Sequence, residues 1–201
     1  MINTFYKLVI PGPRMALFII LLCSPFFAGA QSFKPGSVQY LTATNGINNQ
    51  LVLGANIDNL QATNLSYLDN DSSIDADSCL KYAYTDPHAL AAFGDSLNLD
   101  MVGVRAYKNK IVNIYLFFKI DDAYKVLNHF ISMYGQFTDR PDNYSDIYNW
   151  DSSSSSLSLR YQYKAGLGVA IFTCKELQSE IEASKQSAIS RVYNQALSLN
   201  N

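Results

Sequence analysis

The sequence predicts an α+β protein: a curved antiparallel sheet with helices packed on one face, and a further helix at the C-terminus. Two β-hairpin patterns, within 101–119 and 155–174, provide most of the strand signal. Between them, residues 121–134 place their apolar side chains at the period of an α-helix. Strand pairs that alternate with helical segments are typical of a sheet layered against helices.

The segments before the first hairpin have weaker patterns. Residues 38–42 alternate like a short strand, and 51–61 read as an extended entry followed by a short helix that begins near Asn56. In 79–84, Leu80 and two tyrosines alternate with Cys79, a lysine and an alanine, which predicts a half-buried strand.

The first hairpin and the helix after it are the clearest features. Runs 101–107 and 111–119 are rich in β-branched and aromatic residues and flank a polar turn. The second run is almost entirely apolar, so we expect it in the centre of the sheet with both faces covered. Asp122 and its neighbour begin the helix, and Gly135 ends it.

The second half repeats this organisation. A short strand at 147–150 precedes alternating residues at 157–163, a turn, and a strand at 168–174. The serine run between the first two strands is better read as a hairpin loop than as a flexible linker. The tail, 175–199, is helical in pattern, and its three glutamates, the only ones in the chain, lie where acids favour the helix dipole.

The two halves resemble each other. Each runs from a helix to a strand and then to a hairpin, with Arg105 or Arg160 before the turn. The similarity indicates two αβββ units that share one sheet. Chance is the competing explanation, because hairpins have similar compositions.

A family resemblance follows from these structural motifs. The stretch LVLGANIDNL at 51–60, the helix ending at Tyr134-Gly135, and Trp150 before the second hairpin look like small exported bacterial α+β domains that are uncharacterised. In layout the chain also resembles the β-lactamase-inhibitor-like fold. That resemblance implies helix-plus-sheet repeats and a role in binding other proteins, and it implies no catalytic residue.

The first thirty residues have the composition of a signal peptide. Lys7 and Arg14 precede an apolar run at 15–27 that is too short to span a bilayer. Ala28-Gly29-Ala30 fits a signal-peptidase site, so we expect cleavage after Ala30 and one globular domain at 31–201. This predicts a periplasmic or secreted protein. An uncleaved membrane anchor is the alternative.

Charge and hydropathy narrow the range of partners. Removing Lys7 and Arg14 from the 15 basic residues leaves 13, against 17 acidic residues, for a net charge of about −4. No basic stripe is present, so nucleic acid is not an expected partner. After the leader no stretch is long and apolar enough to predict a transmembrane helix.

Two cysteines, Cys79 and Cys174, follow the leader. An even number in an oxidising compartment favours a disulfide between them. Two buried free thiols are the alternative, because pairing geometry is not visible in a sequence.

The Asp-rich stretch SYLDNDSSIDADSC at 66–79 invites comparison with a calcium loop. A loop starting at Asp69 would place Ile74 where an EF-hand needs glycine, and Leu80 where it needs a bidentate glutamate. The stretch is therefore predicted to be a solvated connection, with a looser calcium site as the alternative.

Catalytic motifs are missing from the sequence. His88 lies in a turn pattern and His129 beside the apolar stripe of its helix, and no His or Cys pair has metal-ligand spacing. No G-x-S-x-G elbow or glycine-rich phosphate loop occurs. We expect no metal and no cofactor. A cell-envelope hydrolase remains the alternative, and a histidine in a pocket beside a carboxylate would favour it.

Aromatic residues cluster around the second hairpin, at Tyr148, Trp150, Tyr161 and Tyr163. Such residues anchor interfaces, although tyrosine also packs well in ordinary sheets. The sequence therefore predicts an exported, non-enzymatic binding domain. Its partner is a protein or an envelope component, and these four residues are candidate contacts.

Overall fold

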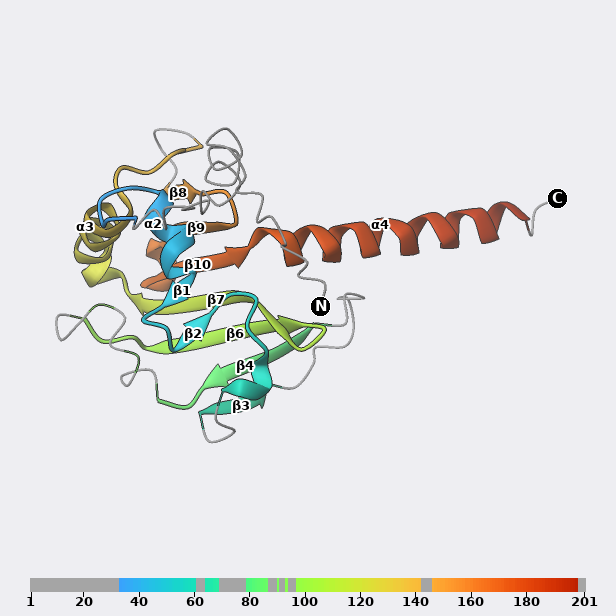
Figure 1. Cartoon of the computed structure of the whole chain (residues 1–201), viewed down its shortest axis with the longest axis horizontal. Coiled ribbons are helices and arrows are strands. Elements are labelled where there is room, and N and C mark those ends of the chain that lie inside the picture. Colours follow the sequence, from blue (N-terminus) through green and yellow to red (C-terminus); the bar gives the residue numbers. More distant parts are fainter. Residues whose placement is uncertain are drawn as a thin grey trace, which may run out of the picture. The chain divides into compact units, whose positions relative to one another are not determined.

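The computed structural model describes residues 33–60, 64–68, 79–86, 97–141 and 146–198, together with Leu90 and Phe93. Seven strands form one antiparallel sheet in the order β3-β4-β6-β7-β10-β9-β8, and two short strands form a separate β1-β2 ribbon (Figure 1). The described residues also form three helices, one of them C-terminal, so the predicted α+β fold is confirmed.

The main elements have the following bounds. The strands are β1 (Gly46–Ile47), β2 (Leu51–Val52), β3 (Leu65–Leu68), β4 (Leu80–Tyr84), β6 (Met101–Tyr107), β7 (Lys110–Lys119), β8 (Ile147–Asp151), β9 (Ser155–Gln162) and β10 (Leu167–Cys174). The helices are α2 (Gln39–Thr44), α3 (Ala123–Tyr134) and α4 (Lys175–Ser198).

Two three-strand meanders make up most of the sheet. Strands β4, β6 and β7 form one, and β8, β9 and β10 form the other. The meanders join where β7 pairs antiparallel with β10, with Ile114 opposite Phe172. Strand order is therefore similar in the two halves, but the helices differ. The helix expected before the first meander is a 3-10 turn, Ile57–Asn59, whereas α3 before the second has 12 residues. Helix α2 packs against α3 and β9 of the second half.

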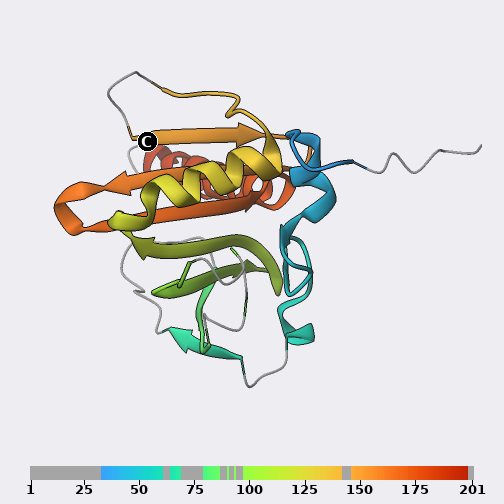
Figure 2. The same ribbon diagram turned by 90° about the vertical axis from the view of Figure 1, so that its left-hand side faces the viewer.

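The core lies between the sheet and α3. Figure 2 shows α3 lying across one face of the sheet, with α4 on the far side. Val126, Phe130 and Tyr134 form the buried face of α3. They pack on every second residue of the central strands. In β10 these residues are Ala170 and Phe172, and both are fully buried.

Among its described side chains, helix α4 packs on the sheet through those of its first turns. Leu177 and Ile181 are buried in a small cluster with Tyr107, Val112 and Cys79 on the face opposite α3. Further along, Ile189 is 63% exposed. Within the part of the chain that the structure describes, no helix combines the length and apolarity needed to cross a bilayer.

Three local predictions were wrong or incomplete. Residues 38–42 were expected to form a strand, but α2 is helical there because one turn buries Leu41 completely in the core. The helix expected near Asn56 is a single 3-10 turn, capped by the Asn56 side chain, which accepts a hydrogen bond from the backbone N–H of Asp58 at 2.9 Å. Strand β3 was not predicted.

Candidate functional site

The four aromatic residues predicted as contacts do lie together, on the helix-covered side of the second meander. Tyr148 packs against Tyr161 with ring centroids 5.9 Å apart, and Tyr161 against Tyr163 at 6.2 Å. The Tyr161 hydroxyl donates to the carbonyl oxygen of Ala123 at 2.7 Å. Of the four, Tyr163 is the one with a largely exposed side chain, at 61%.

Trp150 is part of the core. Its side chain is fully buried, and its ring meets Phe130 and Phe137 edge-on. The structure therefore assigns Trp150 a packing role, while Tyr163 and the edges of Tyr148 and Tyr161 remain accessible.

The opposite face of the sheet carries a second group of large side chains. In β10 the residues facing α3 are buried, whereas Val169, Ile171 and Leu167 on the other side are half-buried or exposed. No described helix covers this side beyond the first turns of α4. We call it the open face. Its central rows are Met101, Phe117 and Val169, and next to them Gly103, Tyr115 and Ile171, as the strand registers show.

Gly103 opens a notch in this face. With no side chain there, a cavity of about 210 Å³ forms over the ring of Tyr115, between Met101, Phe117 and Leu68. Met101 is 41% exposed and Leu68 is 42% exposed. Apolar side chains thus form its floor and walls.

Cationic side chains frame the notch. Lys81 and Arg105 line one side of it. Burial raises the pKa of the Tyr115 hydroxyl, while the nearby positive charge of Arg105 and Lys81 acts in the opposite direction. Arg105 is held in place, because its Nη1 donates to Asn113 at 3.0 Å and to Gln178 of α4 at 3.4 Å.

The outer strands give the open face a polar margin. Across β9 and β8, the row continues from Ile171 to Ser158 and Asn149. A shallow depression of about 450 Å³ lies there, lined by hydroxyl, amide and charged side chains that include Arg160 and Asp151. Asp151 forms an ion pair with Lys175 at 3.0 Å.

The predicted disulfide is not present. Cys79 and Cys174 are free thiols, one buried and one half-buried. Cys79 immediately precedes β4, and Cys174 ends β10, with β6 and β7 between these strands. Three strand spacings amount to about 14 Å, well beyond the reach of a disulfide.

Among the described residues that line the pocket of His129, none is a carboxylate. This pocket lies between α2, β1 and α3, and its described residues are aromatic, aliphatic, hydroxyl-bearing or amide-bearing. Burial lowers the pKa of His129, which keeps the imidazole neutral at pH 7. His88 lies outside the described residues.

The described residues contain no candidate metal site. Among them, no three His, Cys, Asp or Glu side chains gather as ligands would. The Asp-rich stretch falls at 69–78, outside the described residues, so the structure does not test its role.

Sequence reasoning missed the open face for a definable reason. The apolar run at 111–119 correctly indicated a central strand, and the prediction then assumed that both of its faces were covered. Phe117 and Tyr115 are half-buried instead. The alternation of Met101, Gly103 and Arg105 along β6 was the available signal, because it mixes apolar and charged residues on one face.

Comparisons of the chain with protein-family models, with curated proteins and with solved structures find no match.

Proposed function

We propose that this protein is an exported, non-enzymatic binding domain that docks a partner protein on the open face of its sheet. The observation behind this proposal is the exposure of large apolar side chains around the notch at Gly103. Sheets normally bury their apolar face against another layer, and contiguous exposed apolar surface marks interaction sites.

The layout of the open face matches that of a protein interface. An apolar centre at Met101, Phe117 and Val169 is bordered by the polar side chains of β9 and β8. Protein interfaces have this combination of a desolvated centre and a polar rim. A notch of the size seen at Gly103 suits one aliphatic or aromatic anchor side chain from the partner.

Charge indicates the partner's chemistry. Among the described residues the open face carries the cations Lys81, Arg105, Lys119 and Arg160. Against them stand two carboxylates, and both have partners: Asp151 pairs with Lys175, and Asp139 accepts a hydrogen bond from Asn149 at 3.4 Å. The whole chain has a net charge of −2. A basic face on an acidic protein favours an apolar anchor flanked by acidic residues, and it disfavours pairing of two copies through the same face.

Export is the second part of the proposal. The leader-like composition of residues 1–30 and the small residues before Gln31 support cleavage after Ala30 and a periplasmic or secreted location. The resemblance to the β-lactamase-inhibitor-like layout supports protein binding as the activity. The hydrolase alternative gains no support from His129, whose described pocket neighbours include no acid.

Site-specific photocrosslinking tests the docking surface. A benzophenone amino acid replaces Met101 on the open face, and the matched control replaces Tyr124, which is 75% exposed on α3. Each variant is produced in the organism from which the protein comes, and the cells are irradiated. The mass of the purified variant is then measured. We expect a discrete protein adduct from position 101 and none from position 124.

Affinity measurements then test whether the crosslinked partner binds at the notch. The crosslinked partner is purified and its affinity measured for wild type and for Gly103→Leu, which fills the notch. We expect at least a tenfold loss of affinity, since an interface anchor contributes more than 1.4 kcal/mol. Adducts at both positions, or equal affinities, would rule out the open face. The same amino acid at position 163 covers the alternative: an adduct there and none at 101 would return the site to the aromatic cluster.

A further inference from the structure

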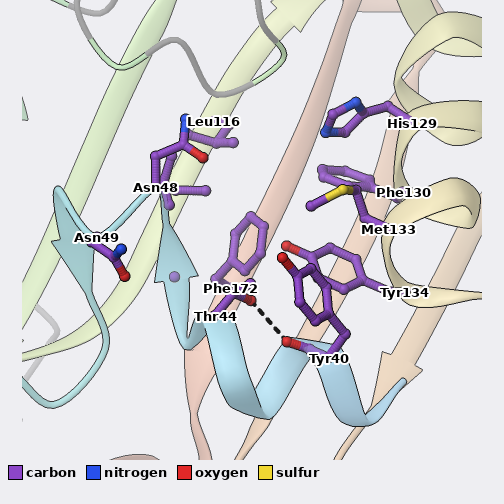
Figure 3. A pocket seen from close by; sticks show the side chains of 12 residues that line it. Tyr40, Thr44, Asn48, Asn49, Leu116, His129, Phe130, Met133, Tyr134 and Phe172 are labelled. Atoms are coloured by element: carbon purple, nitrogen blue, oxygen red, sulfur yellow. Dashed lines mark hydrogen bonds between the residues drawn. The ribbon is translucent and has the colours of Figure 1, made fainter. Parts of the chain in front are cut away.

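A second cavity lies on the other side of the sheet, independent of the open face. It lies between α2, β1 with the turn after it, and α3, and its volume is about 170 Å³ (Figure 3). Leu116 of β7 and Phe172 of β10 form its floor. We propose that this cavity is a binding site for a small, uncharged aromatic compound with one polar substituent, such as a phenol.

The walls are aromatic. Phe130 lies 6.0 Å from both Tyr134 and Phe172, and Tyr134 meets Phe172 edge-on at 6.4 Å. Tyr40 of α2 adds a ring 6.3 Å from that of Tyr134. A ring entering this space would find edge and face partners of the kind that aromatic pairs prefer.

Polar groups converge on one part of the cavity. Figure 3 shows the hydroxyl groups of Tyr40 and Tyr134 side by side, with Thr44 below them, while His129 lies higher, beyond Phe130 and Met133. The Thr44 hydroxyl donates to the carbonyl oxygen of Tyr40 at 3.1 Å. Burial raises the pKa of Tyr134 to about 12, and the Thr44 hydroxyl opposes that rise. Tyr134 therefore remains a neutral hydrogen-bonding group.

The lining of the cavity disfavours a charged ligand. None of its described lining residues is an acid, a lysine or an arginine. The lowered pKa of His129 leaves its imidazole neutral. An ionised ligand would lose its hydration without gaining a counter-charge, whereas a neutral polar group loses much less.

The volume of the cavity also limits how large the ligand can be. An apolar protein cavity of about 150 Å³ is known to hold benzene, and drug-sized sites start at about 300 Å³. The volume of about 170 Å³ therefore accommodates a single six-membered ring with a small substituent.

The rim is built in an unusual backbone conformation. Asn48 and Asn49 have φ values of 46° and 58°, in the left-handed region. Asn48 is fixed there because its Nδ2 donates to the carbonyl oxygen of Leu90 at 3.1 Å. Asparagine adopts the left-handed conformation more readily than other non-glycine residues, and the hydrogen bond to Leu90 anchors the turn over the cavity.

Methyl NMR of the purified protein tests the site with phenol, toluene and benzoate as probes. Met133 lines the cavity and Met101 lies at the notch of the open face, so their methyl signals report the two sites separately. We expect phenol to shift the Met133 methyl in a saturable way and to leave Met101 unchanged. Toluene should bind at least fivefold more weakly, and benzoate should cause no saturable shift.

Variants assign the polar contact. Tyr134→Phe and Tyr40→Phe each remove one hydroxyl and keep the ring, and each should weaken phenol binding roughly fivefold to tenfold, the effect of one neutral hydrogen bond. Toluene affinity should stay the same. Tyr161→Phe is the matched control, because its hydroxyl bonds Ala123 outside the cavity. A Met133 methyl that does not respond to phenol, or equal binding of phenol and toluene, overturns the proposal.

Discussion

The indole Nε1 of Trp150 donates a hydrogen bond of 2.8 Å to the carbonyl oxygen of Gly135. Gly135 ends α3 with a φ of 77°, and a Cβ at this position would collide with the backbone of Gly36. The bond therefore joins β8 to the end of α3 at a point where the N-terminal segment also packs. It explains why the one tryptophan of the chain lies in the core.

Trp150→Phe should lower the free energy of unfolding by roughly 1–3 kcal/mol. The substitution removes buried apolar volume and leaves the Gly135 carbonyl without its partner. Urea denaturation followed by far-UV circular dichroism measures the change. Tyr124→Phe, at a 75% exposed position, is the control and should stay within about 0.5 kcal/mol of wild type. Equal stability of Trp150→Phe and wild type would contradict the assigned packing role.

Gly168→Ala should destabilise the centre of the sheet by about 1–3 kcal/mol. A Cβ at Gly168 would overlap the ring of Phe118, directly opposite on β7. Phe118→Leu in the same chain should recover part of the loss, because it removes the overlapping ring atoms. Gly103→Ala is the matched control, since its Cβ would lie 3.6 Å from the nearest atom of Tyr115. Urea midpoints that fall equally for both alanine variants would refute this explanation.

His129 should make stability depend on pH below about 6.5, the ordinary pKa of the imidazole in the unfolded chain. Burial lowers its pKa in the folded protein, whereas the unfolded chain has the ordinary value of about 6.5. The unfolded state therefore binds the proton more readily, and stability is lost as pH falls from about 6.5 towards the folded pKa. His129→Gln should flatten this part of the profile relative to wild type, measured as melting temperature against pH. Parallel profiles for His129→Gln and wild type would contradict the lowered pKa of the imidazole.

The two thiols should be found reduced. Denatured protein without reductant should give thiol titres for both Cys79 and Cys174, because their strands lie too far apart to be bridged. Before denaturation Cys174 should react faster, since Cys79 is only 5% exposed. Absence of titratable thiol would mean that oxidation rearranges this end of the sheet.

Local patterns were sufficient for much of the fold. The hairpin at 101–119, the helix ending at Gly135 and the strands at 155–174 were all predicted, because each has a strong period and a clear turn or cap. Residues 38–42 were mispredicted because a six-residue helix has little intrinsic signal. It forms when Leu41 enters the core.

The candidate sites depended on long-range contacts. Tyr134, Tyr40 and Asn48 are scattered over nearly a hundred residues, and no spacing rule joins them into one cavity. The same is true of Lys81, Gly103 and Tyr115 around the notch, which come together through strand register.

By itself the sequence determined the α+β class, the central position of 111–119 and the acidic net charge, because period, turn chemistry and composition are local properties. The tertiary structure alone decided that Trp150 is buried, that Cys79 and Cys174 are apart, and that one sheet face is left open. Those outcomes follow from strand order and from which helices reach which face. Both depend on packing between segments distant in the chain.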